Sequence, residues 1–227
     1  MNLYDTGKKI IMEHKKLLAI SSTIFNFIGL NKISSKGKNN KIKKANVFMK
    51  KCKIKVVGNN NNICIGEMSY LQNTSIVIYG NNNEVILKEK NYVNNGDFYL
   101  EDDNNQLKIG YRTTLAGNTH LALTEGKKIT IGEKCLFSSN IVFRTGDSHS
   151  ILDINGKRIN YGQDINVENH VWITQNVTVL KGAAIPTDSV VATGSIVTRK
   201  FEKGNVLLAG NPAKIIKENI NWNNIRI

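Results

Sequence analysis

A short polar interruption in the chain holds one of its four histidines beside a small-residue turn. The stretch "IVFRTGDSHSILDINGKRINYGQ" covers residues 141–163 and contains His149 close to Gly146 and Asp147. A neutral imidazole can remove a proton from a hydroxyl group near neutral pH. Asp147 could orient that imidazole, or it could be a solvated loop carboxylate. The stretch therefore predicts a general base on a loop that leaves an otherwise regular chain.

The regular part begins with four segments that repeat every 22 residues, from residues 54, 76, 98 and 120. Runs rich in glycine and asparagine, such as residues 58–62, separate their apolar parts and tolerate the left-handed backbone that sharp corners need. Short strands between such corners, at a fixed period, predict a β-solenoid in which like residues stack into core rows. The predicted rows are Val56, Ile78, Leu100 and Ala122; Ile63, Val85, Leu107 and Ile129; and Ile65, Leu87, Ile109 and Ile131.

After residue 161 the period changes to six. An aliphatic residue recurs at every sixth position, with a mostly small or β-branched residue two positions before it, which suits the inside of a triangular coil of three hexapeptide faces. Residues 131 and 167 are 36 residues apart, twice the 18 residues of such a coil, so the register continues across the polar interruption. The aliphatic positions are Val167, Ile173, Val179, Ile185, Val191 and Val197; the preceding ones are Ile165, Val171, Val177, Ala183, Ser189 and Ser195.

The histidines and cysteines do not predict a metal site. A zinc centre needs three or four converging ligands, but His120, His149 and His170 are 29 and 21 residues apart, and His120 falls in the inward row that starts at Ile54. His170 is expected to point outward, as a functional, interface or surface residue. Cysteines occur only at positions 52, 64 and 135 and lack C-x-x-C spacing, which favours reduced thiols in a cytoplasmic protein.

The positive charge is concentrated near the N-terminus. Residues 1–55 carry 14 lysines against Asp5 and Glu13, whereas the other 172 residues are nearly neutral. Residues 8–30 have helical character, and residues 17–30 are uncharged but too short to span a bilayer. We expect a helix that packs on the main domain or on a neighbouring subunit, or that lies on an anionic membrane surface. Residues 32–55 are predicted to be a basic linker.

Three stretches together resemble the hexapeptide-repeat acyltransferases, in particular the galactoside and maltose O-acetyltransferases and the polysialic acid O-acetyltransferases of bacterial capsules. They are "ITIGEKCLFSSNIVFRTGDSH", "INVENHVWITQNVTVLKGAAIPTDSVVATGSIVTRKF" and "LLAGNPAKIIKE". The resemblance covers residues 54–222. It implies an all-β fold, a left-handed parallel β-helix with a protruding active-site loop. We therefore expect a basic N-terminal helix and linker at residues 1–50 and the acyltransferase domain at residues 51–227.

The resemblance implies an acetyl-CoA-dependent O-acetyltransferase that modifies a hydroxyl of a surface-polysaccharide sugar, with sialic acid or polysialic acid as a candidate acceptor. His149 matches the general base of a direct transfer. Trp172 matches the tryptophan beside the pantetheine arm and the acetyl group, and its outward position favours contact with a ligand or a subunit. Asn118 matches an acceptor contact, although a structural corner asparagine is equally compatible. The remaining acceptor candidates are Asp147, Lys157 and Arg158.

For the cofactor, the resemblance implies backbone contacts at Thr174 and Gly194. It also implies basic contacts to the nucleotide end from residues 198–200 and from the C-terminal part of the chain. Thr174 departs from the family, which has a glycine there that lets the cofactor approach closely. The candidates for the nucleotide end are Thr198, Arg199, Lys200, Lys214 and Lys217.

Partners and rival functions complete these expectations. The resemblance implies a homotrimer with each active site between two subunits and no metal, and residues 1–50 are candidates for peripheral membrane association at the inner face. Nucleic acid is disfavoured because the lysine run lacks interleaved aromatic residues. The alternatives are an N-acetyltransferase of an amino sugar nucleotide, which needs the same base, and a non-catalytic polysaccharide-binding module, which would not bind coenzyme A.

Overall fold

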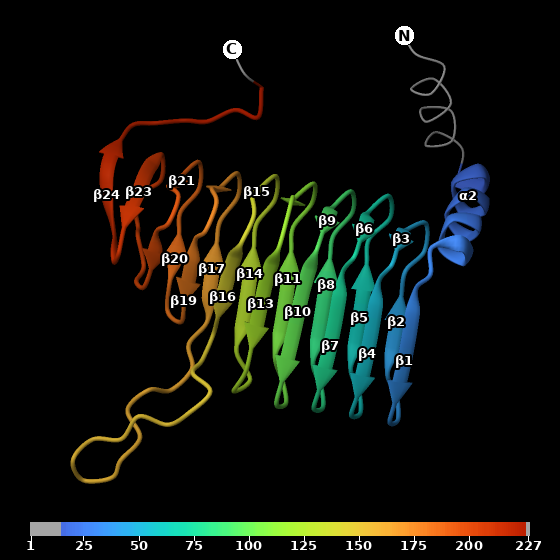
Figure 1. The fold of residues 1–227 in the computed structure, drawn as a ribbon, viewed down its shortest axis with the longest axis horizontal. Coiled ribbons are helices and arrows are strands. Elements are labelled where there is room, and N and C mark those ends of the chain that lie inside the picture. The colour runs from blue at the N-terminus through green and yellow to red at the C-terminus, as the bar shows by residue number, and fades with distance from the viewer. Residues whose placement is uncertain (1–14, 226–227) are drawn as a thin grey trace.

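Three sheets, parallel except for one antiparallel pair at the C-terminal end, form the sides of a triangular prism in the computed structural model, which describes residues 15–225 (Figure 1). Each coil of the chain contributes one strand to sheet A, one to sheet B and one to sheet C in turn. Sheet A has the order β1 (Lys32–Lys36), β4 (Lys53–Val57), β7 (Ser75–Tyr79), β10 (Gly96–Glu101), β13 (Thr119–Leu123), β16 (Ile141–Arg144), β19 (Thr178–Leu180) and β22 (Ile196–Val197).

Sheets B and C follow the same succession. Sheet B has the order β2 (Lys41–Lys43), β5 (Asn62–Ile65), β8 (Glu84–Leu87), β11 (Gln106–Ile109), β14 (Lys128–Ile131), β17 (Ile165–Val167) and β20 (Ala184–Ile185). Sheet C runs from β3 (Phe48–Lys50) through β6 (Tyr70–Gln72), β9 (Tyr92–Asn94), β12 (Thr114–Leu115), β15 (Leu136–Phe137), β18 (Trp172–Ile173) and β21 (Val190–Val191) to β23 (Val206–Gly210) and β24 (Ala213–Glu218). The predicted all-β parallel β-helix is confirmed.

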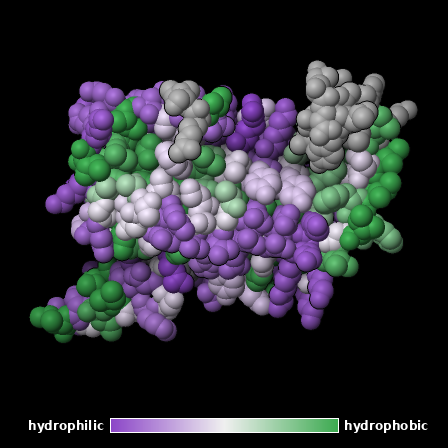
Figure 2. All heavy atoms as spheres, turned by 45° about the horizontal axis from the view of Figure 1, so that its top comes forward, coloured by the Kyte–Doolittle hydropathy of each residue, from purple (hydrophilic) through white to green (hydrophobic). Residues whose placement is uncertain are grey.

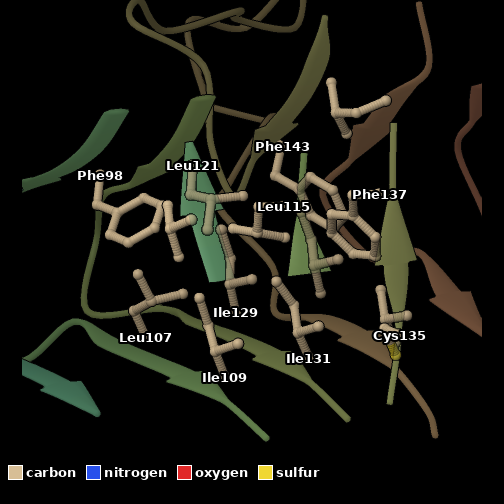
Figure 3. Close-up of a cluster of buried hydrophobic side chains, with 14 of the residues drawn as sticks. Phe98, Leu107, Ile109, Leu115, Leu121, Ile129, Ile131, Cys135, Phe137 and Phe143 are labelled. Atoms are coloured by element: carbon tan, nitrogen blue, oxygen red, sulfur yellow. The ribbon is translucent and has the colours of Figure 1, made fainter. Parts of the chain in front are cut away.

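The core is a set of stacked apolar rows inside the prism. Strand residues alternate between the interior and the surface, so inward residues of successive coils lie on one another. Ile129 and Ile131 pair with Ile165 and Val167, which confirms that the register continues across the 36-residue spacing. Figure 3 shows the middle of this core, where the rings of Phe137 and Phe143 stack with centroids 5.6 Å apart. All twelve residues of the predicted hexapeptide rows are buried.

The register differs from the sequence prediction in one coil. Leu100 pairs with Leu123, and the residue paired with Asp97 is His120. The prediction that Ala122 and His120 lie in inward rows is therefore wrong. The coil before β13 contains one residue more than the 22 assumed, and a shift of one residue along a strand moves a side chain to the other face. His120 consequently points outward, with its Nδ1 2.8 Å from Asp97 Oδ2.

The N-terminal part of the described chain is more ordered than predicted. The helix α2 (Lys15–Ile28) packs on β3, with Leu18 buried and the ring of Phe25 against Phe48, which confirms a helix packed on the main domain. The predicted helical residues 8–14 lie outside the described residues.

The prediction of a basic linker is wrong, because residues 32–50 form the first coil and β1 pairs in parallel with β4. Between residues 15 and 225, no helix is long and apolar enough to cross a bilayer.

The corners between sheets A and B are closed by ladders of asparagine and glycine. The backbone N–H of Asn83 donates to Asn61 Oδ1 at 2.9 Å, and that of Asn105 donates to Asn83 Oδ1 at 2.8 Å. Gly80 in the same corner has φ 131°, and a β-carbon there would overlap the carbonyl oxygen of Asp102 in the next coil. The corners at Gly37, Gly58 and Gly80 therefore accept no side chain at the glycine position, since a β-carbon at each would overlap the carbonyl oxygen of the next coil.

Substitution of this glycine tests the packing of the corner. Gly80→Ala is expected to lower the free energy of unfolding by at least about 3 kcal/mol, because strain at an unfavourable φ adds to a backbone overlap. Gly156→Ala is the matched control, since Gly156 also has positive φ but open space around it, and its expected cost is about 1 kcal/mol. Urea unfolding measures both. Equal costs would contradict the account of the corner.

Candidate functional site

The chain leaves the solenoid at one corner between sheets A and B to form a protruding arm, residues 146–163. It departs after β16 and returns at β17, and Figure 1 shows it as the long excursion at the lower left. Its outer part is a small hairpin, in which the Ile159 N–H donates to the Ile151 carbonyl at 2.9 Å and the Asp153 N–H donates to the Lys157 carbonyl at 2.8 Å. His149 lies in the first half of the arm, between β16 and the hairpin, with an exposed side chain.

Two ion pairs attach the base of the arm to the solenoid. Arg158 donates to Glu125 at 2.5 Å, and Glu125 also accepts from the Gly162 N–H at 3.0 Å. Hydrogen bonding to Arg158 lowers the pKa of the Glu125 carboxyl group. Asp147 pairs with Lys181, and this interaction lowers the pKa of Asp147 in the same way. Both carboxyl groups therefore remain charged, and continue to hold the arm, at acidic pH values where carboxyl groups with ordinary pKa values are already partly protonated.

A buried asparagine links these contacts to the histidine. Asn160, only 7% exposed, donates to Asp147 Oδ2 and to the carbonyl oxygen of His149, both at 2.8 Å. Asp147 thus fixes the backbone near His149 through Asn160. Across the described chain no hydrogen bond joins the Asp147 carboxylate to the imidazole, so the structure gives no support to direct orientation of the ring by Asp147.

The other acceptor candidates differ in whether their side chains already have partners within the chain. Arg158 is occupied by Glu125 and by the ring of Tyr161, 5.0 Å from its guanidinium carbon. The Lys157 side chain is exposed on the hairpin. Asn118 lies at a different corner, between sheets C and A, where it starts an asparagine ladder by donating to Asn140 Oδ1 at 3.2 Å. Asn118 is thus part of a surface ladder and lies apart from the arm of its own chain.

An aromatic cluster surrounds Trp172 on the outer side of sheet C. The Trp222 ring stacks on His170 with centroids 4.3 Å apart and lies 5.9 Å from the Trp172 ring. The Trp222 indole N–H donates to the His170 carbonyl at 2.8 Å, and His170 Nδ1 lies 2.7 Å from Asp188 Oδ1. Trp172 is half-buried, and its indole N–H is covered but has no acceptor in the described part of the chain. An unmet buried donor costs about 1–3 kcal/mol, which makes this N–H a candidate for binding a ligand oxygen.

Sequence reasoning placed His170 outward but gave no role to Trp222 or Asp188. One signal in the sequence was available: Trp222 is the second of only two tryptophans, in a polar tail that should not need an aromatic residue. An open hollow of about 400 Å³ beside this cluster is lined by Glu133, Lys134, Asn169, His170 and Asp188, and none of these is a predicted cofactor residue.

Two cofactor candidates lie at the corners between sheets C and A. Thr174 Oγ1 donates to the Val191 carbonyl of the next coil at 2.7 Å, so its hydroxyl is turned toward the wall of the solenoid. Gly194 has φ 74°, and a β-carbon there would meet no atom within 4 Å. The surface at Gly194 is therefore open, whereas the threonine that replaces the family glycine is bonded to its own protein.

The basic candidates fall into two places. Thr198, Arg199 and Lys200 follow β22 at the corner between sheets A and B, and a bridge joins Lys200 to Ala184 of sheet B. Lys214 and Lys217 lie on β24, at the end of sheet C. All five side chains are exposed. No group of three or more histidine, cysteine, aspartate or glutamate side chains within residues 15–225 is arranged to hold a metal ion.

One chain thus divides the predicted site between opposite sides of the prism. His149, Asp147 and residues 198–200 belong to the corner between sheets A and B, whereas Trp172 belongs to sheet C, the side opposite that corner. The prism is filled by its core, so these groups do not meet through it. An active site that uses both groups needs a second copy of the chain.

A solenoid of hexapeptide coils, interrupted by a braced arm that carries a histidine, defines the hexapeptide-repeat acyltransferase class. The crystal structure of the polySia-specific acetyltransferase NeuO has a TM-score of 0.81 and 31% identity, over 86% of this chain and 89% of that chain. The polysialic acid O-acetyltransferase OatWY has a TM-score of 0.80 and 34% identity, over 86% and 92%. The chain belongs to the family of hexapeptide-repeat O-acetyltransferases that includes these two proteins.

Curated relatives agree over a shorter stretch. The polysialic acid O-acetyltransferase of Escherichia coli O1:K1 / APEC is 37% identical over 50% of this chain, and that of Neisseria meningitidis is 36% identical over 51%. The galactoside O-acetyltransferase of Escherichia coli K12 is 35% identical over 44%. The matched stretches cover 37%, 54% and 49% of these relatives' own lengths. No protein-family model matches the chain.

The cover over Trp172 can be tested by fluorescence, because the chain has only two tryptophans. Trp222→Ala and Trp222→Phe both leave Trp172 as the single emitter. We expect Trp222→Ala to shift its emission to longer wavelength, since the indole loses an aromatic neighbour and gains water, whereas Trp222→Phe should retain most of the cover. Identical emission maxima in the two variants would show that the tail does not cover Trp172.

Proposed function

We propose that the protein is an acetyl-CoA-dependent O-acetyltransferase that modifies a hydroxyl group of a surface-polysaccharide sugar, with sialic acid or polysialic acid as the acceptor class. One observation carries the proposal. The arm that interrupts the solenoid is held by ion pairs and presents an exposed histidine, whose ring has no hydrogen bond to any residue from 15 to 225. The names of the family members and relatives support the reaction and the acceptor class.

In the proposed reaction His149 acts as a general base without a covalent acetyl-enzyme. Acetyl-CoA supplies the acetyl group as a thioester. His149 takes the proton from the acceptor hydroxyl as its oxygen bonds to the thioester carbon, and it returns that proton to the sulfur when the carbon–sulfur bond breaks. Trp172 lies beside the acetyl group, and its indole N–H, which is covered and lacks an acceptor in the described chain, donates to the negative charge that develops on the carbonyl oxygen once acetyl-CoA displaces that cover.

The chain's own residues fit a coenzyme A arm and its phosphates. The open surface at Gly194 lets a ligand approach the backbone closely, and Trp172 lies one strand earlier on sheet C. Thr174 would offer its backbone, since its hydroxyl is already bonded. Exposed basic side chains suit phosphate groups. These are Arg199 and Lys200 beside Thr198, and Lys214 and Lys217 on β24.

We propose a homotrimer in which His149 of one subunit faces Trp172 of the next. The separation of the two groups within one chain supports this arrangement, and so does the exposed apolar surface of the arm. A subunit contact would remove that surface from water. The large apolar residues of the arm that are more than half exposed are Ile151, Leu152, Ile154, Ile159 and Tyr161. A cytoplasmic location is proposed from the free thiols of Cys52, Cys64 and Cys135.

Removal of the base tests the proposed function. His149→Ala is expected to lower kcat for acetyl transfer to polysialic acid by about 100-fold or more, with little change in acetyl-CoA affinity. His120→Ala is the matched control, because His120 is a surface histidine paired with Asp97.

Light scattering should show an unchanged mass for both variants, so that the loss reflects chemistry rather than assembly. Wild-type kcat in His149→Ala, or an acetylated enzyme trapped on quenching, would overturn the assignment. A wild-type protein that neither binds coenzyme A nor transfers acetyl groups to any saccharide would overturn the proposed function itself.

A further inference from the structure

The helix α2 has two apolar stripes, and only one of them packs on the solenoid. Leu18 and Ser22 are 3% exposed, and Phe25 contacts Phe48 and Tyr70, so this stripe faces sheet C. Asn26 secures it by donating to the Val47 carbonyl at 2.8 Å. The other stripe, which a helix of 3.6 residues per turn places on the far side, remains in water. Its members are Leu17, Ile20, Ile24, Phe27 and Ile28, with exposures from 44% to 89%.

This exposed stripe contains no charged residue, and a basic coil lies next to it. From residue 17 to residue 31 the sequence has no charged side chain, and from residue 32 to residue 66 it has ten lysines and no acidic residue. Those lysines surround the N-terminal end of the prism on all three sheets, and none is buried. Figure 1 places α2 at this same end, beyond β3, and Figure 2 shows hydrophobic surface there beside hydrophilic surface.

We propose that this end of the prism docks on an anionic lipid bilayer. The exposed stripe of α2 enters the boundary between headgroups and acyl chains, and the lysines of the first coil contact lipid phosphates. The two features supply the two signals that stable attachment of a surface helix needs, apolar burial and attraction to negative headgroups. The inference does not depend on the acetyltransferase proposal.

Lipid suits the two features better than the other occupants do. A polyanionic saccharide would account for the lysines but not for five large apolar side chains in water. A second copy of the chain would cover the apolar stripe, but it would bring two lysine-rich coils with like charge toward each other. An anionic bilayer is complementary to both parts of the surface.

Vesicle sedimentation of the full chain tests the proposal. The probes are vesicles of phosphatidylcholine alone and of phosphatidylcholine with about one third phosphatidylglycerol. The wild type should bind the anionic vesicles and be released by high salt. Ile24→Asp combined with Phe27→Asp should weaken that binding at least about tenfold, as should Lys41→Glu combined with Lys43→Glu. Ile216→Asp is the control, because Ile216 is an exposed apolar residue on β24, at the opposite end of the prism, and this variant should bind as the wild type does.

Binding to soluble polysialic acid and the mass in solution separate the alternatives. Under the proposal, the aspartate variant keeps the wild-type mass and its affinity for polysialic acid. Absence of wild-type binding to anionic vesicles would overturn the proposal. If the wild type then bound polysialic acid in a salt-sensitive way, the lysines would be assigned to the saccharide. If the aspartate variant then had a reduced mass, the exposed stripe would be assigned to a subunit contact. Equal vesicle binding by the aspartate variant and the wild type would also overturn it.

Discussion

The hydrogen-bonded stacking of one coil on the next is the constraint on which the rest of this structure depends. Each coil supplies the backbone partners of its neighbour, and each inward residue must lie on a similar one, so every residue of a coil belongs to one of three sheets or three corners. This regularity leaves few positions from which a functional group can project. It places the arm with His149 at one corner and Trp172 on the opposite side, and that separation is the basis of the proposed site shared between subunits.

The arm carries a functional group away from the solenoid, which the coils themselves cannot do. A coil of short strands and tight corners has no segment long enough to reach beyond its own surface, so the chain must leave the solenoid and return without disturbing the register. The 36-residue spacing between Ile131 and Val167 achieves this, since β14 still pairs with β17. Glu125 and Lys181, from coils on either side of the excursion, then hold the base of the arm through Arg158 and Asp147. The scaffold thereby fixes the backbone near His149 and leaves its ring free.

Much of this arrangement can be predicted from the sequence, because the sequence pattern of a solenoid repeats with each coil. The six-residue rows and the interruption at His149 are visible without any structure. The sequence predictions were wrong where the pattern is weak or the spacing varies. One extra residue in the coil before β13 places His120 on the outer face. The many lysines of the first coil suggested a linker, although β1 pairs with β4. The contacts of Trp172 with Trp222, and of His170 with Asp188, join residues by stacking and hydrogen bonding across the surface, which no periodicity encodes.

Mixed trimers test the shared site most directly. A chain with His149→Ala and a chain with Trp172→Phe, given different tags and co-expressed, would each form inactive trimers alone. If the base and the indole come from different subunits, every mixed trimer contains one intact site, and its kcat should be about one third of the wild-type value. If both groups act from the same chain, the purified mixed trimers will be as inactive as their parents, and the shared site will be wrong.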